Sequence, residues 1–166
     1  MPHGITCGIA TWRWGREAPT GAKARHKETT VIGVVVVTHG QLATELLNAA
    51  EAIVGNLPQF AAVSIGWHDN VDDARDEISR AIARFQSGGG VLVLTDMFGG
   101  TPSNLSLTFL ETDKVEIVTG VNLPMLIKLA GLRQSKDLLA VARELRDTGR
   151  SAIHVPSDLM RGEIKS

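Results

Sequence analysis

The chain has 166 residues, of which 43% are hydrophobic and 21% are charged, and its formal net charge is −1. This length suffices to bury a core, and the lack of a basic excess argues against nucleic acid or an anionic membrane surface as a partner. Aromatic residues are scarce and Cys7 is the single cysteine, which argues against base-stacking platforms and excludes an intrachain disulfide and a cysteine-based metal site. We expect a cytoplasmic protein.

Residues 1–30 match neither a helical nor a strand periodicity. They mix glycine, proline, threonine and basic residues, and they lack the apolar stretch of about 7–15 residues that a secretory signal needs. His3, His26 and Cys7 share no metal-ligand spacing. We therefore predict a poorly ordered N-terminal extension, and whether it belongs to the native protein stays open.

The first predicted strand is the valine-rich run over 31–37, at the start of the stretch VIGVVVVTHG. A short β-branched run is typical of a strand that is covered on both faces at the centre of a parallel sheet. The apolar pattern that follows predicts a helix over 41–54. His39 then stands at the carboxyl end of a central strand, where open α/β sheets bind their ligands.

The rest of the chain alternates between strand and helix patterns. We predict strands at 60–67, 91–94, 115–118 and 152–155, helices at 71–86, 102–110, 124–130 and 135–148, and a polar C-terminal tail over 156–166. Asp69 or Asn70 is expected to cap the second helix, and Thr101 is expected to cap the third, with Pro102 as its first residue. The alternation indicates βαβ units and therefore an α/β domain with a mostly parallel sheet.

Three loops, 38–40, 95–101 and 119–123, are expected at one edge of this sheet. They contain His39, Asp96 and a glycine-rich segment that leads into a helix. Neutral imidazole is nucleophilic near neutral pH, and backbone amides at a helix start favour anions, so His39 is a candidate carrier of a phosphoryl group. We predict that Asp96 binds one ring nitrogen of His39 and leaves the other free to attack.

A plainer interpretation stays open, in which His39 and Asp96 are polar residues at a sheet rim, as we expect for His68 and His154. GxGxxG, GxxxxGK[ST] and GxSxG are all absent, which argues against dinucleotide, nucleoside-triphosphate and serine-hydrolase sites. Asp96 also follows the third strand, where a receiver domain has its phosphoacceptor. Receivers hold Mg²⁺ with acidic residues after the first strand, and here that place reads Thr38-His39-Gly40.

The stretches VIGVVVVTHGQLATELLNAAEAIVG, VLVLTDMFGGTPSN and VEIVTGVNLPML resemble the enzyme IIA component of the mannose-type sugar phosphotransferase system. The similarity runs through residues 31–155, and its most specific part is the signature Asp-x-x-Gly-Gly-[Ser/Thr]-Pro-x-Asn. The resemblance implies a doubly wound α/β domain over 31–155 that forms a homodimer. It also implies that Ala152–Val155 is an antiparallel last strand, exchanged between the two subunits.

The resemblance further implies a site in which His39 accepts phosphate from the histidine-containing phosphocarrier protein and passes it to an enzyme IIB partner. Asp96 matches the aspartate that binds the active histidine, and Thr101 matches a hydroxyl residue that binds the phosphoryl group. Gly99 and Gly100 match backbone positions of the same pocket, and Asn122 matches its third wall. The implied chemistry needs neither a metal nor another cofactor.

The downstream role of such a domain stays open on the sequence alone. Because the chain ends soon after the last predicted strand, we expect the IIB partner to be a separate protein, beside a membrane permease with which the domain associates peripherally. A regulatory role that reports phosphorylation state is an alternative to sugar transport. Two further functions also stay open: a phosphoryl donor subunit related to dihydroxyacetone kinase, and a non-catalytic anion-binding α/β module.

Overall fold

The computed structural model describes residues 31–86, 88–132 and 137–161. The predicted N-terminal extension at 1–30 and the last five residues of the predicted C-terminal tail lie outside these ranges. None of the described helices has the length and apolar character that crossing a lipid bilayer requires.

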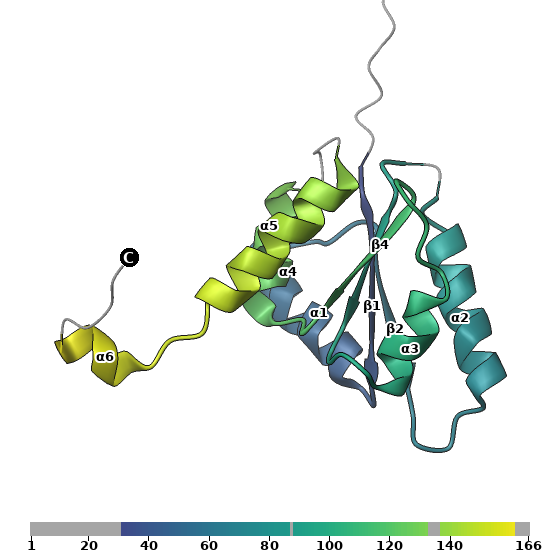
Figure 1. Ribbon diagram of the computed structural model, residues 1–166, viewed down its shortest axis with the longest axis horizontal. Helices are drawn as coiled ribbons and strands as arrows, with labels where there is room; N and C mark the ends of the chain where they lie inside the picture. Colours follow the sequence, from purple (N-terminus) through teal and green to yellow (C-terminus); the bar gives the residue numbers. More distant parts are fainter. Residues whose placement is uncertain (1–30, 87, 133–136, 162–166) are drawn as a thin grey trace, which may run out of the picture.

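A four-stranded parallel sheet forms the centre of the molecule, with the strand order β2-β1-β3-β4. The strands are β1 (Gly33–His39), β2 (Phe60–Ile65), β3 (Val91–Thr95) and β4 (Val115–Thr119). The helices are α1 (Leu42–Val54), α2 (Val71–Ala83), α3 (Thr101–Leu107), α4 (Leu123–Leu132), α5 (Leu138–Ser151) and α6 (Pro156–Arg161). Helices α1, α4 and α5 cover one face of the sheet, and α2 and α3 cover the other (Figure 1). The predicted α/β fold with a parallel sheet is confirmed.

The valine run of β1 is buried on both faces of the sheet. Val34 and Val36 pack with α1, α4 and α5, while Val35 and Val37 pack with α2 and α3. Successive side chains of a strand point to opposite faces, so a strand between two helical layers needs apolar residues at every position. This is why the run is continuous rather than alternating.

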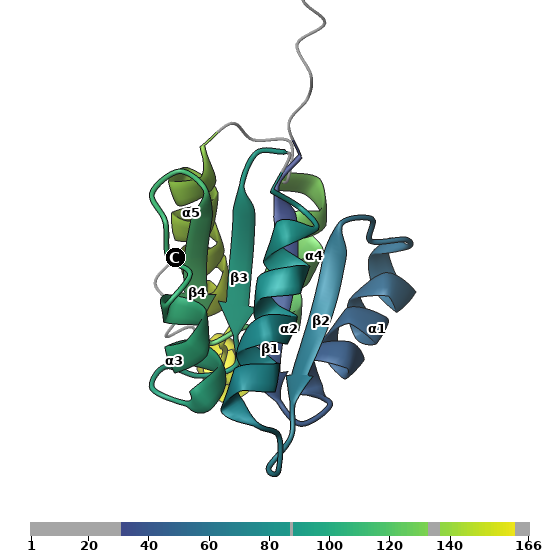
Figure 2. The same ribbon diagram turned by 90° about the vertical axis from the view of Figure 1, so that its right-hand side faces the viewer.

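The strand order creates a switch point between β1 and β3. From β1 the chain crosses to β2 on one side, and it then returns to build β3 and β4 on the other. Ligands of open α/β sheets bind outside the carboxyl ends of the strands at such a point. In Figure 2 the carboxyl ends of the strands lie together at one edge, with the β2–α2 loop projecting beyond them.

Two element boundaries near the site differ from the sequence prediction. β1 continues two residues past the predicted end, because Thr38 pairs with Ser64 and His39 with Ile65 of β2. Thr101 is the first residue of α3 and not its cap, since Gly100 occupies the cap position in an extended conformation. Asn70 caps α2 by accepting a hydrogen bond from the Asp72 amide at 2.8 Å.

The predicted strand at 152–155 is not a strand in this single chain. Ala152 ends α5, and the three residues after it are irregular and lead to α6, which stands apart from the sheet (Figure 1). Ile153 and Val155 are both exposed. Within the described residues β4 is an edge strand, so the exchanged antiparallel strand and the homodimer stay predictions.

Candidate functional site

His39 stands at the last position of β1, where the chain turns sharply into α1. The hydroxyl of Thr38, which is fully buried, accepts a hydrogen bond from the Ala43 amide at 2.7 Å and ties the strand to the first turn of the helix. Gly40 has a φ of +54° and donates its amide to the Ile65 carbonyl at 2.8 Å. The imidazole is thereby held at the sheet edge with its side chain 46% exposed.

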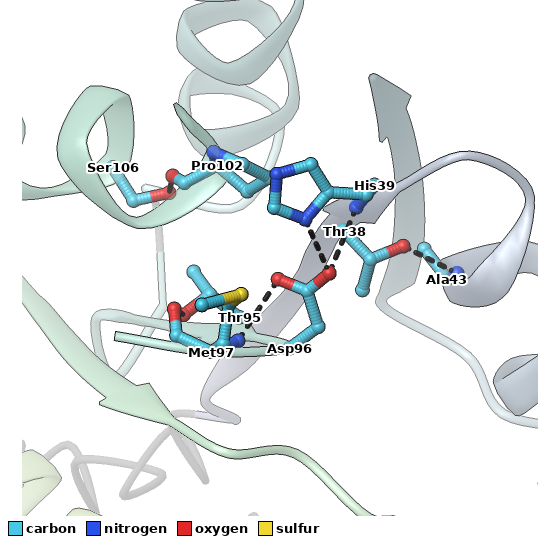
Figure 3. Close-up of polar contacts among 8 residues, drawn as sticks. All are labelled: Thr38, His39, Ala43, Thr95, Asp96, Met97, Pro102 and Ser106. Carbon is cyan, nitrogen blue, oxygen red and sulfur yellow. Dashed lines mark hydrogen bonds and ion pairs between the residues drawn. The ribbon is translucent and has the colours of Figure 1, made fainter. Parts of the chain in front are cut away.

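Asp96, directly after β3, holds His39 through two hydrogen bonds (Figure 3). Its Oδ2 lies 3.0 Å from the His39 amide nitrogen and 2.7 Å from Nδ1 of the imidazole. Its Oδ1 accepts the Met97 amide at 2.9 Å. The contact predicted between these two side chains, 57 residues apart in sequence, is present in the structure.

The hydrogen bonds decide the protonation state of this pair. Partial burial would raise the pKa of Asp96, but the His39 amide, the imidazole and the Met97 amide outweigh it, so the pKa lies below its ordinary value. A carboxylate is only an acceptor, and Nδ1 must therefore carry the proton of the bond that joins them. In neutral imidazole this leaves Nε2 as the nitrogen with a free electron pair.

A cavity of about 250 Å³ opens beside His39. Thr101 lines it together with His39, so these two predicted site residues share one space. The remaining lining residues are Ile65, Gly66, Trp67, Asp69, Val71 and Ala74. Asp69 is already engaged, because its carboxylate accepts the Gly66 amide.

Gly99 and Gly100 shape the loop between Asp96 and α3. Gly99 has a φ of +85°, a conformation that residues with a side chain rarely adopt. A Cβ at Gly100 would lie only 2.7 Å from Cε1 and 3.2 Å from Nε2 of His39. The backbone at Gly100 therefore packs directly against the edge of the imidazole that Asp96 leaves free.

Asn122 lies elsewhere in the structure. Its amide oxygen accepts the Met125 amide at 3.2 Å, which caps α4, and its amide nitrogen donates to the Gly149 carbonyl at 3.1 Å. It lines a separate cavity with Arg146 and Arg150, and not the cavity that contains His39. A role for Asn122 at the phosphoryl group stays a prediction, while its bonds join α4 to α5.

Comparison with known proteins identifies the family of this chain. Residues 33–145 match the family model described as the PTS (phosphotransferase system) fructose IIA component, which spans both His39 and Asp96. The chain belongs to this family.

Relatives of this family are named for several sugars. The chain is 31% identical over 127 residues to the mannose-specific EIIAB component of Escherichia coli, an alignment that covers 74% of the chain and 38% of that relative. It is 26% identical over 129 residues to the fructose-specific EIIA component of Bacillus subtilis, covering 77% of the chain and 88% of the relative. The chain thus spans well under half the length of the first relative and most of the second.

The solved structure of a PTS IIA protein associated with the fucose utilization operon of Streptococcus pneumoniae has the same fold. It superimposes with a TM-score of 0.71 at 27% identity, covering 79% of this chain and 97% of that one. The mannose-type IIA identification made from the sequence is therefore confirmed at the level of family and fold.

Two residues of this candidate site are not predicted from the sequence. Thr38 is part of the THG stretch, but its buried bond to α1 depends on the helix that packs above it. Trp67 falls within the predicted strand at 60–67, yet β2 ends at Ile65 and the tryptophan lies in the exposed turn that follows. The signal for that turn in the sequence is a glycine before Trp67 and three polar residues after it, His68, Asp69 and Asn70.

In the described ranges no three His, Cys, Asp or Glu side chains come close enough together to hold a metal ion. His68 and His154, which we expect as polar residues at the sheet rim, are exposed and lie outside the cavity beside His39, and neither belongs to a strand.

Proposed function

We propose that this IIA protein is a phosphoryl carrier in which Nε2 of His39 accepts a phosphoryl group from the histidine-containing phosphocarrier protein and passes it to an enzyme IIB component. One observation supports this above all others. Asp96 binds Nδ1 at 2.7 Å, which orients the ring and leaves Nε2 free of this bond, on a side chain that lines the cavity.

The phosphoryl group can pass between the two histidines without the gain or loss of a proton. The Nε2 electron pair of His39 attacks phosphorus while the phosphorus–nitrogen bond of the donor phosphohistidine breaks. If the donor ring carries a proton on its other nitrogen, it leaves as neutral imidazole. His39 then holds a phosphoimidazolium whose Nδ1–H faces the ionised carboxylate of Asp96, and this charge pairing stabilises the phosphorylated state.

The same residues account for the two directions of transfer. The products and reactants are both phosphohistidines, so the step depends on positioning more than on acid catalysis. Thr101 lines the cavity and Gly100 contacts the ring edge, which puts a hydroxyl and a backbone turn next to the incoming phosphoryl oxygens. We assign phosphoryl binding to Thr101 and to the Gly99–Gly100 backbone on this basis.

The first test is phosphorylation with purified components. The protein is incubated with enzyme I, the phosphocarrier and labelled phosphoenolpyruvate, beside the variants His39→Ala and His68→Ala. We expect label that is acid-labile and base-stable on wild type and on His68→Ala, and none on His39→Ala. If wild type remains unlabelled while the phosphocarrier itself is labelled, His39 is only a polar residue at the sheet rim.

A further inference from the structure

Two arginines of α5 line a cavity that the proposed phosphoryl transfer does not use. Arg146 and Arg150 are four residues apart, so they lie on the same side of the helix. Both line a cavity of about 250 Å³ at the carboxyl end of β4, together with Thr119 and Met125. We call this space the arginine cavity.

The arginine cavity is separate from the cavity beside His39. The two share no lining residue. Residues of α2 and α3 line the His39 cavity, and residues of α4 and α5, on the opposite face of the sheet, line the arginine cavity (Figure 1). In the sheet, β3 lies between β1 and β4. A ligand in the arginine cavity is therefore not the phosphoryl group proposed for His39.

The positive charge of the arginine cavity is only partly neutralised. Asp147 binds Nε of Arg146 at 2.8 Å, which leaves the other guanidinium N–H groups of Arg146 without a partner among the described residues. The side chain of Arg150 has neither a hydrogen bond nor an ion pair within the described ranges. Glu144, the second acidic residue of α5, pairs with Lys128 at 3.2 Å instead. Most guanidinium donors of the two arginines are therefore left to bind an anion.

The helix dipole accounts for one of these charges and not for the pair. Arg150 is in the last turn of α5, where a cation is favoured by the partial negative charge of the helix end. Arg80 has the same place in α2 and does not line the arginine cavity. Arg146 adds a second like charge four residues away, an arrangement that destabilises a helix. The pair therefore favours an anion that binds both guanidiniums.

The lining of the arginine cavity fits a phosphate group. A guanidinium presents its N–H groups in a planar fork that matches pairs of phosphate oxygens. A phosphate monoester carries about −1.5 to −2 charges at pH 7, so one such group can bind both arginines. Thr119 adds a hydroxyl without a hydrogen bond among the described residues, and buried Met125 adds an apolar wall. Since drug-sized ligands occupy sites of about 300–1,000 Å³, this cavity suits a smaller molecule.

We propose that the arginine cavity is a non-covalent binding site for a phosphate group, held by Arg146 and Arg150. The phosphate comes from a small phosphate monoester or from free inorganic phosphate. This site goes beyond the proposed function, because it needs neither a phosphoryl donor nor phosphorylation of His39. It assigns the chain a small-molecule ligand in addition to the covalent phosphoryl group.

The binding test uses the full, unphosphorylated chain and two probes, glycerol 3-phosphate and inorganic phosphate. Calorimetric titration in about 0.1 M salt measures the affinity, with glycerol as the uncharged comparison. We expect both phosphate probes to bind and glycerol not to bind. Tighter binding of glycerol 3-phosphate identifies an ester as the source of the phosphate, and equal or tighter binding of inorganic phosphate identifies the free ion.

Variants at exposed positions test the two arginines without disturbing the core. Arg146→Gln and Arg150→Gln should each weaken phosphate binding by about 10- to 100-fold, the loss expected for charged hydrogen bonds. Arg150→Lys keeps the charge but not the planar fork, and should recover part of that loss. Arg80→Gln is the matched control, because it removes the same charge from the last turn of another helix, and we expect the wild-type affinity for it.

Backbone amide NMR locates the bound phosphate independently of the variants. We expect the probes to shift the signals of Gly120 and Gly149, which line the arginine cavity, and not those of Gly40 and Gly100 near His39. The proposal is overturned if neither probe binds, if Arg80→Gln loses as much affinity as Arg150→Gln, or if only Gly40 and Gly100 shift. These measurements use no phosphoryl donor, so they stay decisive even if His39 is never phosphorylated.

Discussion

Asp96 accepts three hydrogen bonds, and two of them come from His39, whose imidazole it orients. The carboxylate thus fixes both the backbone and the ring of His39, which explains how an exposed imidazole keeps one orientation at a sheet edge. At the residue scale, the proposed phosphoryl transfer depends on the negative charge of Asp96. Changes to that charge are therefore expected to alter stability as well as phosphoryl transfer.

The lowered pKa of Asp96 predicts a pH-dependent contribution to folding. Since the folded-state pKa lies below the ordinary value of 3.8, the unfolded chain binds this proton more readily than the folded chain. The stabilisation is therefore complete above about pH 5 and is lost as the pH falls through the folded-state pKa. We expect the difference in free energy of unfolding between wild type and Asp96→Asn to shrink on acidification from pH 6 toward about pH 3, measured by urea denaturation. A constant difference over this range would show that the carboxylate charge does not stabilise the fold.

The loop between β3 and α3 sets the position of the ring from the other side. A Cβ at Gly100 would lie 2.7 Å from Cε1 of His39, too close for any real contact, so Gly100→Ala must displace the imidazole. We expect labelling of His39 to slow by up to about 100-fold, because a displacement of about 1 Å in a reacting group can cost that much in rate. Nitrogen NMR of the imidazole should show at the same time that the Nδ1 bond to Asp96 is weakened.

Gly131→Ala is the control for the same chemical change. Gly131 lies in α4 with open space around its missing Cβ. Alanine in a helix is favoured over glycine by about 1 kcal/mol, so this variant should be slightly more stable and fully active. Equal labelling of the two alanine variants would mean that the packing of Gly100 against His39 has no role in transfer.

At the scale of the whole molecule, β4 is an edge strand of the sheet. Among the described residues its outer side pairs only at Val115, which bridges to Glu111, and the chain after α5 exposes Ile153 and Val155. An uncovered strand edge favours pairing with another chain. The family resemblance supplies a candidate, in which residues 152–155 of a second copy pair with β4.

This predicts a dimer in solution. Light scattering should give twice the 17.8 kDa mass of the chain, and Ile153→Asp should shift the protein toward the monomer by placing a charge in the exchanged segment. His68→Ala, a change at an exposed residue of the β2–α2 loop, should leave the mass unchanged. A monomeric wild type at micromolar concentration would rule out the exchanged strand.

Most of the sheet can be predicted from the sequence because its signals are local. The Val34–Val37 run and the Thr95-Asp96 ending each identify a strand and its carboxyl end without knowledge of the neighbours. The predicted end of β1 is two residues early, because the extension depends on pairing with β2. The segment at 152–155 has a β-branched pattern but no partner within one chain, and a pattern alone does not form a strand.

Part of the candidate site can likewise be predicted from the sequence, and part of it cannot. His39 and Asp96 are predictable, since both lie at the carboxyl ends of strands that the topology places side by side. The family resemblance implies that Asn122 forms the third wall of the same pocket, and its side chain is bound to the Met125 amide and the Gly149 carbonyl. Where a side chain points depends on the helices that pack against it, and the spacing of residues in the sequence does not contain that information.

The central claim is that the phosphoryl group is carried on one particular nitrogen. Phosphorus and nitrogen NMR of the protein phosphorylated by the phosphocarrier separates Nε2-phosphohistidine from Nδ1-phosphohistidine directly. The hydrogen bond from Nδ1 to Asp96 predicts a single species, phosphorylated on Nε2 of His39, whose Nδ1–H remains protected. Phosphate on Nδ1, or on any residue other than His39, would contradict the account.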